Sequence, residues 1–233
     1  MKLSEIAIMN FRLLQYARMR LDTTGITTIL VGPNNSGKTS AIEAMLTFLQ
    51  RPIKQLSIND FSLGCRDALK KFEQHVLAPP AAAAPAGGEA AVAAPPPLPD
   101  LPVLSLRLKF DYDDTGPDLA IAGELLMDLE DASASVMVEI RFAPANPEQL
   151  AQAYLKDRDD DQSLFDYLAA TLHDHYKLDQ FKLSPDGSEA ERLPDRGILQ
   201  RLIRIDVVSA QRHIDDREEG SKATRLSTLL HTH

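Results

Sequence analysis

Residues 26–49, ITTILVGPNNSGKTSAIEAMLTFL, decide which fold this chain adopts. The apolar run at residues 29–31 predicts a buried strand, and after Ser40 the apolar residues recur at helical spacing, namely Ala41, Ile42, Met45, Leu46 and Leu49. Between the two, residues 32–39 match G-x-x-x-x-G-K-[ST], a pattern that is meaningful only where a strand precedes it and a helix follows. The stretch therefore predicts a strand, a phosphate-binding loop and a helix in direct succession.

The spacing of the motif assigns a chemical task to each position of the loop. Gly32 and Gly37 allow a tight turn, so that backbone N–H groups and the positive end of the helix dipole point at one anion. Lys38 is then placed beside the β- and γ-phosphates of a nucleotide, and the Thr39 hydroxyl binds Mg²⁺. We expect ATP and Mg²⁺ as cofactors, Lys38 as a catalytic residue, and phosphate contacts from Gly32, Pro33, Asn34, Asn35, Ser36, Gly37, Lys38, Thr39 and Ser40.

The composition is that of a globular protein without a membrane segment. A length of 233 residues suits one large domain or two small ones, and 44% of the residues are hydrophobic. No run of eighteen apolar residues occurs, and the N-terminal residues lack both a long apolar region and a cleavage site. The single cysteine, Cys65, excludes an internal disulfide and a cysteine-cluster metal site. We therefore expect a cytoplasmic protein with no membrane contact.

The charge is unevenly distributed along the chain. The net charge is −9, but residues 1–60 hold seven Lys or Arg against four Asp or Glu, whereas residues 100–195 hold eight against twenty-two. Proteins that coat duplex DNA normally present a basic surface, so the acidic middle is a poor candidate for DNA contact. Any DNA contact is expected mainly from the ends of the chain or from parts outside it. Within the acidic part, residues 156–161 lack the spacing and the glycine of a calcium loop, which favours a solvated loop over a metal site.

Alternation of apolar and polar residues predicts strands on both sides of the loop, at residues 2–11, 17–22, 103–112, 120–127 and 135–142. The last three suggest an antiparallel sheet beside the nucleotide core. Helical patterns follow at 147–155, 163–175 and 194–202, and an apolar strand at 203–208.

A proline-rich segment divides the chain. Residues 79–102 hold eight Pro, nine Ala and two Gly, and such a segment has too little apolar surface to offset its conformational entropy. We therefore predict an N-terminal lobe with the loop at 1–78, a disordered insertion at 79–102, and the rest of the first lobe at 103–233.

Three further short motifs are present: Asn10-Phe11-Arg12 before the loop, the adjacent pair Asn34 and Asn35 within it, and Asp60-Phe61 after it. In this order they resemble the ATPase heads of SMC, RecF and OLD-type proteins, which belong to the ABC class. The two adjacent asparagines are most similar to the OLD family of ATP-dependent endonucleases, since SMC heads more commonly have Asn-Gly there. The resemblance implies an α/β fold, a P-loop NTPase of ABC/SMC-head type with a central mixed sheet, an antiparallel β lobe and flanking helices.

The resemblance also implies roles for two further residues. In related heads the arginine of the Asn-Phe-Arg element lies close to the nucleotide, so that Arg12 contacts base or phosphate; the alternative is a surface arginine at a strand end. ABC heads place a glutamine near the metal and the attacking water. Gln211 is the candidate for that catalytic and Mg²⁺-binding role, and the alternative is a loop glutamine without a role.

The acidic motif that hydrolysis requires is not evident. Such a site holds Mg²⁺ and polarises water, and its usual form is four apolar residues followed by Asp-Glu. Residues 203–206 have the apolar lead, but Val207 follows Asp206. A Leu-Ser-Gly-Gly signature is also absent. We therefore expect an ATPase head that is not completed within the chain and that, alone, hydrolyses ATP slowly if at all.

Three functions fit these observations. The first is the ATPase part of an OLD-like DNA endonuclease, acting as a homodimer of heads, in some members of that family against phage. The second is a DNA-repair or chromosome-maintenance ATPase of the RecF or SMC kind, without nuclease activity. The third is a non-hydrolysing fragment or interaction module.

Overall fold

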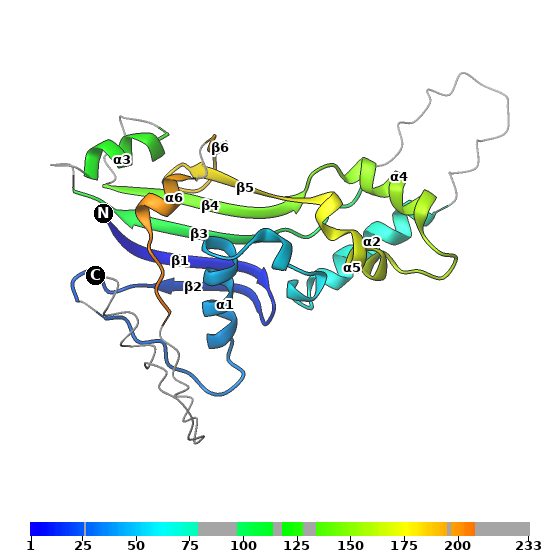
Figure 1. The fold of residues 1–233 in the computed structure, drawn as a ribbon, viewed down its shortest axis with the longest axis horizontal. Coiled ribbons are helices and arrows are strands. Elements are labelled where there is room, and N and C mark those ends of the chain that lie inside the picture. The colour runs from blue at the N-terminus through cyan, green and yellow to red at the C-terminus, as the bar shows by residue number, and fades with distance from the viewer. Residues whose placement is uncertain (26, 79–96, 114–117, 128–133, 195–196, 208–233) are drawn as a thin grey trace, which may run out of the picture.

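The computed structural model of the chain describes residues 1–25, 27–78, 97–113, 118–127, 134–194 and 197–207. Its centre is a sheet of six strands in the order β2-β1-β3-β4-β5-β6, in which every neighbouring pair is antiparallel (Figure 1). The strands are β1 (Lys2–Phe11), β2 (Leu14–Arg20), β3 (Leu104–Asp111), β4 (Ser135–Pro144), β5 (Tyr176–Leu183) and β6 (Ala190–Arg192). The described residues thus form the antiparallel lobe that the sequence predicts.

The core lies against one face of β3 and β4, because every second residue of these strands is apolar. Leu106 lies opposite Ile140 and Leu108 opposite Val138, and all four side chains are fully buried. β1 precedes the proline-rich segment, whereas its neighbour β3 follows it. The two parts of the chain therefore share one sheet; residues 79–96, which make up most of the predicted insertion, lie outside the described residues.

Helices cover one face of the sheet and one of its ends. α1 (Lys38–Leu49) packs on β1 and β3, where Phe48 meets Phe11 with ring centroids 6.3 Å apart. α2 (Cys65–Leu77), α4 (Pro147–Asp157) and α5 (Leu164–His175) contact one another at the end of the sheet next to the β1–β2 turn (Figure 1). In the described part of the chain, no helix is long and apolar enough to cross a membrane.

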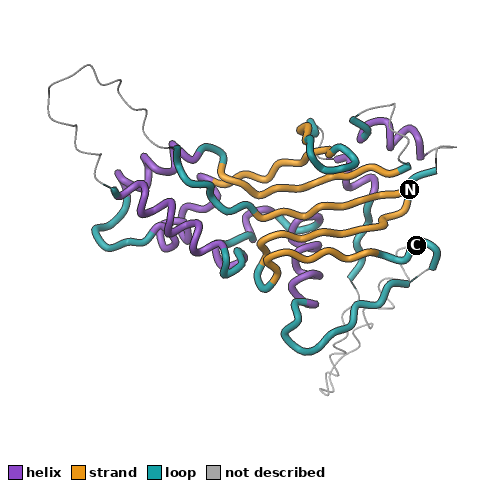
Figure 2. Tube along the Cα trace, turned by 180° about the vertical axis from the view of Figure 1, so that it is seen from behind, coloured by secondary structure: helices purple, strands orange, loops and turns teal. Residues whose placement is uncertain are grey.

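The opposite face of the sheet carries charged pairs between strands. Seen from behind, in Figure 2, the strands lie in front of the helices. Glu139 of β4 is only 4% exposed, and it accepts hydrogen bonds from Arg141 Nε at 2.8 Å and Nη2 at 2.6 Å, while Arg107 Nη2 of β3 lies 3.6 Å away. β3 and β4 are thus apolar on the face that packs on the core and charged on the other face, where the charges are paired.

The predicted strand at residues 120–127 is wrong, because this segment forms helix α3 (Asp118–Leu125). Ala122 and Leu125 are almost completely buried, and residues three apart share one face of a helix. Asp118 lies in the first turn, where a carboxylate is favourable toward the helix dipole. The predicted helices at 147–155, 163–175 and 194–202 are confirmed as α4, α5 and α6 (Gly197–Leu202).

The strand predicted before the loop at residues 29–31 is also not formed. The strand predicted at 203–208 is not formed over residues 203–207, and residue 208 lies outside the described residues. Ile29 is 77% exposed, Val31 is 81% exposed and Val207 is 59% exposed. Parallel strands are normally buried between neighbours on both sides, and the described sheet ends at β2 and β6 without offering such a place. The parallel part of the predicted mixed sheet is therefore not formed by the described residues.

Candidate functional site

The phosphate-binding motif forms a turn at the start of α1. Asn35 has a φ of 63° and Gly37 a φ of 88°, so two residues of the turn adopt the left-handed conformation. A Cβ atom at Gly37 would lie 2.5 Å from Leu14 Cδ2 on β2. Position 37 therefore requires glycine both for its backbone conformation and for its contact with the sheet.

The N-terminus of α1 is open toward this turn. Its N-cap residue, Gly37, has no side chain that could cap it, and the first bond that closes a helical turn runs from Ala41 N–H to the Gly37 carbonyl at 2.9 Å. Uncapped N–H groups at a helix start, preceded by left-handed residues, form a concave site for anions. The geometry at residues 34–40 therefore fits the phosphates of a nucleotide.

Lys38 closes the loop on itself in this structure. Its Nζ donates to the Gly32 carbonyl at 2.6 Å and to the Pro33 carbonyl at 2.5 Å, and it lies 3.4 Å from Ser36 Oγ. The ammonium group is thus inside the loop that the sequence assigns to phosphate. An entering phosphate would exchange neutral acceptors for a charged one, which forms the stronger hydrogen bond.

The predicted metal ligands are only partly described. Thr39 is exposed at the first turn of α1, where its hydroxyl is accessible, whereas Ser40 is buried. Gln211 lies outside the described residues. Among the residues that the structure describes, no three or more His, Cys, Asp or Glu side chains are grouped so as to hold a metal ion. The chemistry present thus fits Mg²⁺ held by Thr39 together with phosphate oxygens.

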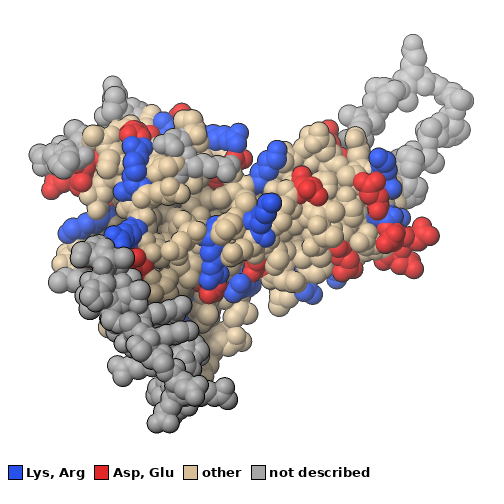
Figure 3. All heavy atoms as spheres, in the orientation of Figure 1, with Lys and Arg blue, Asp and Glu red and all other residues tan. Residues whose placement is uncertain are grey.

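The acidic run at residues 156–161 is the solvated loop that its spacing favours. Asp157 ends α4, Asp159, Asp160 and Asp161 lie between α4 and α5, and all four side chains are exposed. Figure 3 shows acidic side chains gathered at this end of the molecule, far from α1. These carboxylates are therefore not part of the phosphate-binding site.

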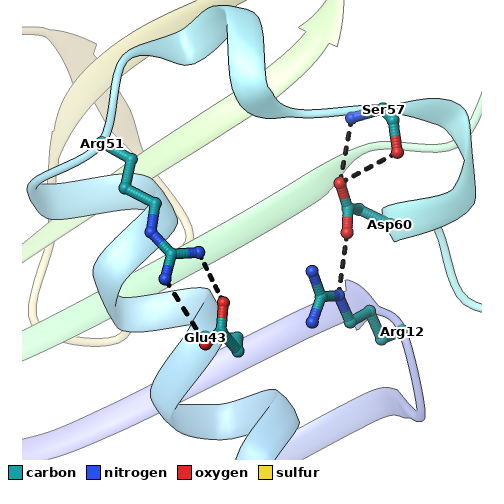
Figure 4. Close-up of polar contacts among 5 residues, drawn as sticks. All are labelled: Arg12, Glu43, Arg51, Ser57 and Asp60. Carbon is teal, nitrogen blue, oxygen red and sulfur yellow. Dashed lines mark hydrogen bonds and ion pairs between the residues drawn. The ribbon is translucent and has the colours of Figure 1, made fainter. Parts of the chain in front are cut away.

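Arg12 is held by Asp60 at the turn between β1 and β2. Its Nε donates to Asp60 Oδ1 at 2.8 Å, and Asp60 Oδ2 accepts from Ser57 N at 2.9 Å and Ser57 Oγ at 3.1 Å (Figure 4). The backbone N–H of Arg12 also donates to the Asp60 carbonyl at 2.7 Å. Two of the motifs noted in the sequence, Asn-Phe-Arg and Asp-Phe, are thus parts of one structural unit.

A second ion pair lies on α1 beside this unit. Arg51 donates to Glu43, with Nη1 and Oε2 2.5 Å apart (Figure 4). The pKa of Glu43 is lowered, first by the hydrogen bond from Arg51, and further by the positive charges of Arg51 and Arg12. Arg12 is therefore close enough to α1 to act on its electrostatics, although the structure places no ligand beside it.

Sequence reasoning missed both ion pairs. Arg12 and Asp60 are 48 positions apart, and Glu43 and Arg51 are eight apart across the end of a helix. A signal for the first pair existed, because both members belong to motifs that were recognised separately. Nothing in the spacing of Glu43 and Arg51 predicts their contact.

A glycine-containing turn, a lysine and a hydroxyl residue at an uncapped helix start are the parts of a P-loop nucleotide site that the described residues supply, whereas the strand that normally precedes the loop is not formed. The chain belongs to the AAA ATPase domain family, which matches residues 1–231. This confirms an ATP-binding ATPase and the α/β class expected from the sequence, with an antiparallel sheet and flanking helices. No curated protein matches the sequence.

Solved structures also match the chain. One comes from work on the "structural biochemistry of ATP-driven dimerization and DNA stimulated activation of SMC ATPases". It is 15% identical, the match covers 88% of this chain and 93% of that one, and the TM-score is 0.32.

Proposed function

We propose that this chain binds MgATP at residues 32–40 and, with a complete active site, hydrolyses it. The observation that carries the proposal is the open N-terminus of α1, in front of which Lys38 donates to the carbonyls of Gly32 and Pro33. Lys38 exchanges these acceptors for β- and γ-phosphate oxygens, while the N–H groups of the turn orient the triphosphate. The Thr39 hydroxyl holds Mg²⁺, which when bound neutralises the charge that develops on the transferred phosphoryl group.

Two further residues complete the proposed site. Arg12 uses only its Nε toward Asp60, and within the described residues its two Nη groups have no hydrogen-bond acceptor, which supports a contact with nucleotide. Gln211 is proposed for the metal and the attacking water on the resemblance alone. The same resemblance supports a homodimer of heads and DNA contact mainly through parts outside this chain. We also propose that residues 1–78, which hold the loop, and residues 103–233 are two parts of one ATPase lobe, separated by the insertion at 79–102.

The particular role that we propose is the ATPase part of an OLD-like DNA endonuclease. The support is the adjacent pair Asn34 and Asn35, together with the unit that joins Asn-Phe-Arg to Asp-Phe. A RecF- or SMC-like ATPase without nuclease activity is the second candidate. The coding sequence after residue 233 separates them, since a Toprim-type domain with clustered acidic residues supports the first and a long heptad repeat the second.

Titration with ATP, in the presence and absence of Mg²⁺, tests the proposed site. Lys38→Ala removes charge-assisted hydrogen bonds worth about 1.5–3 kcal/mol, so we expect ATP affinity to fall roughly ten- to hundredfold. Lys54→Ala is the matched control, because Lys54 is an exposed lysine after α1, in a 3-10 turn at Ile53–Gln55. Equal affinity of the Lys38 variant and the wild type would place ATP elsewhere, and no ATP binding by the wild type would leave only the interaction module.

A further inference from the structure

The β1–β2 turn, which carries Arg12, has an uncommon backbone conformation. Asn10 has a φ of 60° and Arg12 a φ of 49°, so two residues other than glycine lie in the left-handed region. Main-chain hydrogen bonds hold this shape, since Arg12 N–H donates to the Asp60 carbonyl and Ser62 N–H to the Asn10 carbonyl, both at 2.7 Å. Such strain persists where the surrounding structure imposes it, and it is concentrated at functional sites. The main chain thus fixes the point from which the Arg12 side chain extends.

The Asp60 carboxylate fixes the direction of that side chain. Its Oδ1 accepts from Arg12 Nε at 2.8 Å, while its Oδ2 is held by the N–H and the hydroxyl of Ser57 (Figure 4). The Asp60 side chain is 10% exposed, whereas that of Arg12 is 40% exposed. Because Asp60 binds only Nε, the two Nη groups of Arg12 have no acceptor among the described residues. A guanidinium with both Nη groups free can bind a phosphate through two parallel hydrogen bonds.

Glu43 of α1 is a carboxylate that could occupy these Nη groups. Its pKa is lowered mainly by the hydrogen bond from Arg51 and, to a smaller degree, by the charges of Arg51 and Arg12, so Arg12 lies within electrostatic reach. Arg51, however, binds both oxygens of Glu43, with Nη1 2.5 Å from Oε2 and Nη2 3.4 Å from Oε1 (Figure 4). A carboxylate that an arginine holds through both oxygens is strongly engaged. Arg51 therefore keeps Glu43 away from Arg12.

We propose that Asp60 and Arg51 are positioning residues, which keep the two Nη groups of Arg12 available for a phosphate group of the bound nucleotide. Asp60 orients the guanidinium, and Arg51 engages the carboxylate that would otherwise pair with it. The turn that carries Arg12 also adjoins the loop, because a Cβ atom at Gly37 would lie 2.5 Å from Leu14 Cδ2. The proposal rests on the function proposed for residues 32–40.

A double-mutant cycle on ATP affinity tests the role of Asp60. We expect Arg12→Ala to weaken ATP binding roughly tenfold or more, since it removes charge-assisted hydrogen bonds. Asp60→Asn should weaken it roughly three- to tenfold, and should cause no further loss when Arg12→Ala is already present. A merely structural role would weaken binding in both backgrounds. Asp161→Asn, the same change in the exposed acidic loop, is the matched control and should leave the affinity unchanged.

A second pair of variants tests the role of Arg51 and does not depend on how well Asp60→Asn folds. Arg51→Gln releases Glu43, which should then occupy the Nη groups of Arg12 and weaken ATP binding roughly threefold or more. Adding Glu43→Gln to Arg51→Gln should restore the affinity of the wild type, because the competing carboxylate is gone. If the two ion pairs served stability alone, the second substitution would restore nothing.

Lys38→Ala separates failure of this proposal from failure of the proposed nucleotide site. ATP binding by Lys38→Ala as tight as that of the wild type would overturn both. With ATP binding weakened by Lys38→Ala, normal binding by Arg12→Ala would overturn the positioning roles alone. Additive losses from Asp60→Asn and Arg12→Ala would overturn the role of Asp60, and failure of Glu43→Gln to restore binding would overturn that of Arg51.

Discussion

At the scale of single residues, Asp60 joins two distant parts of the chain. Its carboxylate accepts from Arg12 Nε, Ser57 N and Ser57 Oγ, and its side chain is only 10% exposed. Hydrogen bonds to charged groups are worth about 1.5–3 kcal/mol each, and a buried donor that loses its partner is destabilising. The packing of the β1–β2 turn against the chain that follows α1 should therefore depend on the Asp60 side chain.

We expect Asp60→Ala to lower the free energy of unfolding by about 2–4 kcal/mol, measured by urea denaturation. Asp161→Ala, in the exposed acidic loop, should change it by less than about 0.5 kcal/mol. If the two substitutions had equal effects, the Arg12–Asp60 pair would be no more than a surface contact.

At the same scale, the residues that we propose to bind phosphate are recognisable in the sequence because they are consecutive. Residues 32–40 form one turn and one helix start, so their order along the chain is also their order in space. The Arg12–Asp60 pair, in contrast, brings together residues that are 48 positions apart, so only the fold reveals this contact.

At the scale of elements, the sequence predicts strands well where one face is buried and the alternation is long. β3 and β4 meet this condition. The pattern fails at residues 120–127, because a short apolar segment with two buried residues three apart also fits a helix. It fails at residues 29–31 because an apolar run predicts burial only when neighbouring strands are present.

His175, at the junction of α5 and β5, should make the free energy of unfolding depend on pH. Burial lowers the pKa of His175, while the charges of Asp174 and Asp157 oppose this effect, and His175 Nε2 lies 3.3 Å from the Tyr167 hydroxyl. The folded state therefore binds this proton less readily than the unfolded state, whose histidine pKa is about 6.5. The stability that the neutral, partly buried His175 contributes is complete above that pH and is lost as the pH falls below it.

We expect the free energy of unfolding of the wild type to decrease as the pH is lowered from about 7 to about 5. The free energy of unfolding of His175→Gln should decrease less over the same interval. Urea denaturation of both proteins at several pH values measures the difference. Identical pH profiles for the variant and the wild type would show that His175 does not contribute to the slope.

At the scale of the whole molecule, two segments outside the sheet expose large apolar side chains, and one of them leads into the proposed nucleotide site. Residues 27–31 lead into the loop, and residues 203–207 follow α6 as an extended segment (Figure 1). Neither segment belongs to the sheet, and the apolar side chains of Ile29, Val31 and Val207 are therefore more than half exposed. The loop itself is held by Lys38 through two backbone carbonyls. Binding of a triphosphate should therefore order the loop first and then the segment that leads into it.

We expect ATP with Mg²⁺ to stabilise the whole molecule as well as the loop. A ligand that binds only the folded state contributes about 2.7 kcal/mol at one hundred times its Kd. For a chain of this size that corresponds to a melting temperature higher by roughly 5–10 °C. Hydrogen exchange should slow most at residues 27–40. Because the affinity of Lys38→Ala is expected to be ten- to hundredfold lower, ATP at the same concentration should stabilise this variant by only about 0.4–1.4 kcal/mol and slow exchange less. A higher melting temperature without slower exchange at residues 27–40 would place the nucleotide away from α1. A triphosphate bound at the start of α1 must contact the backbone N–H groups of this loop and so protect them from exchange.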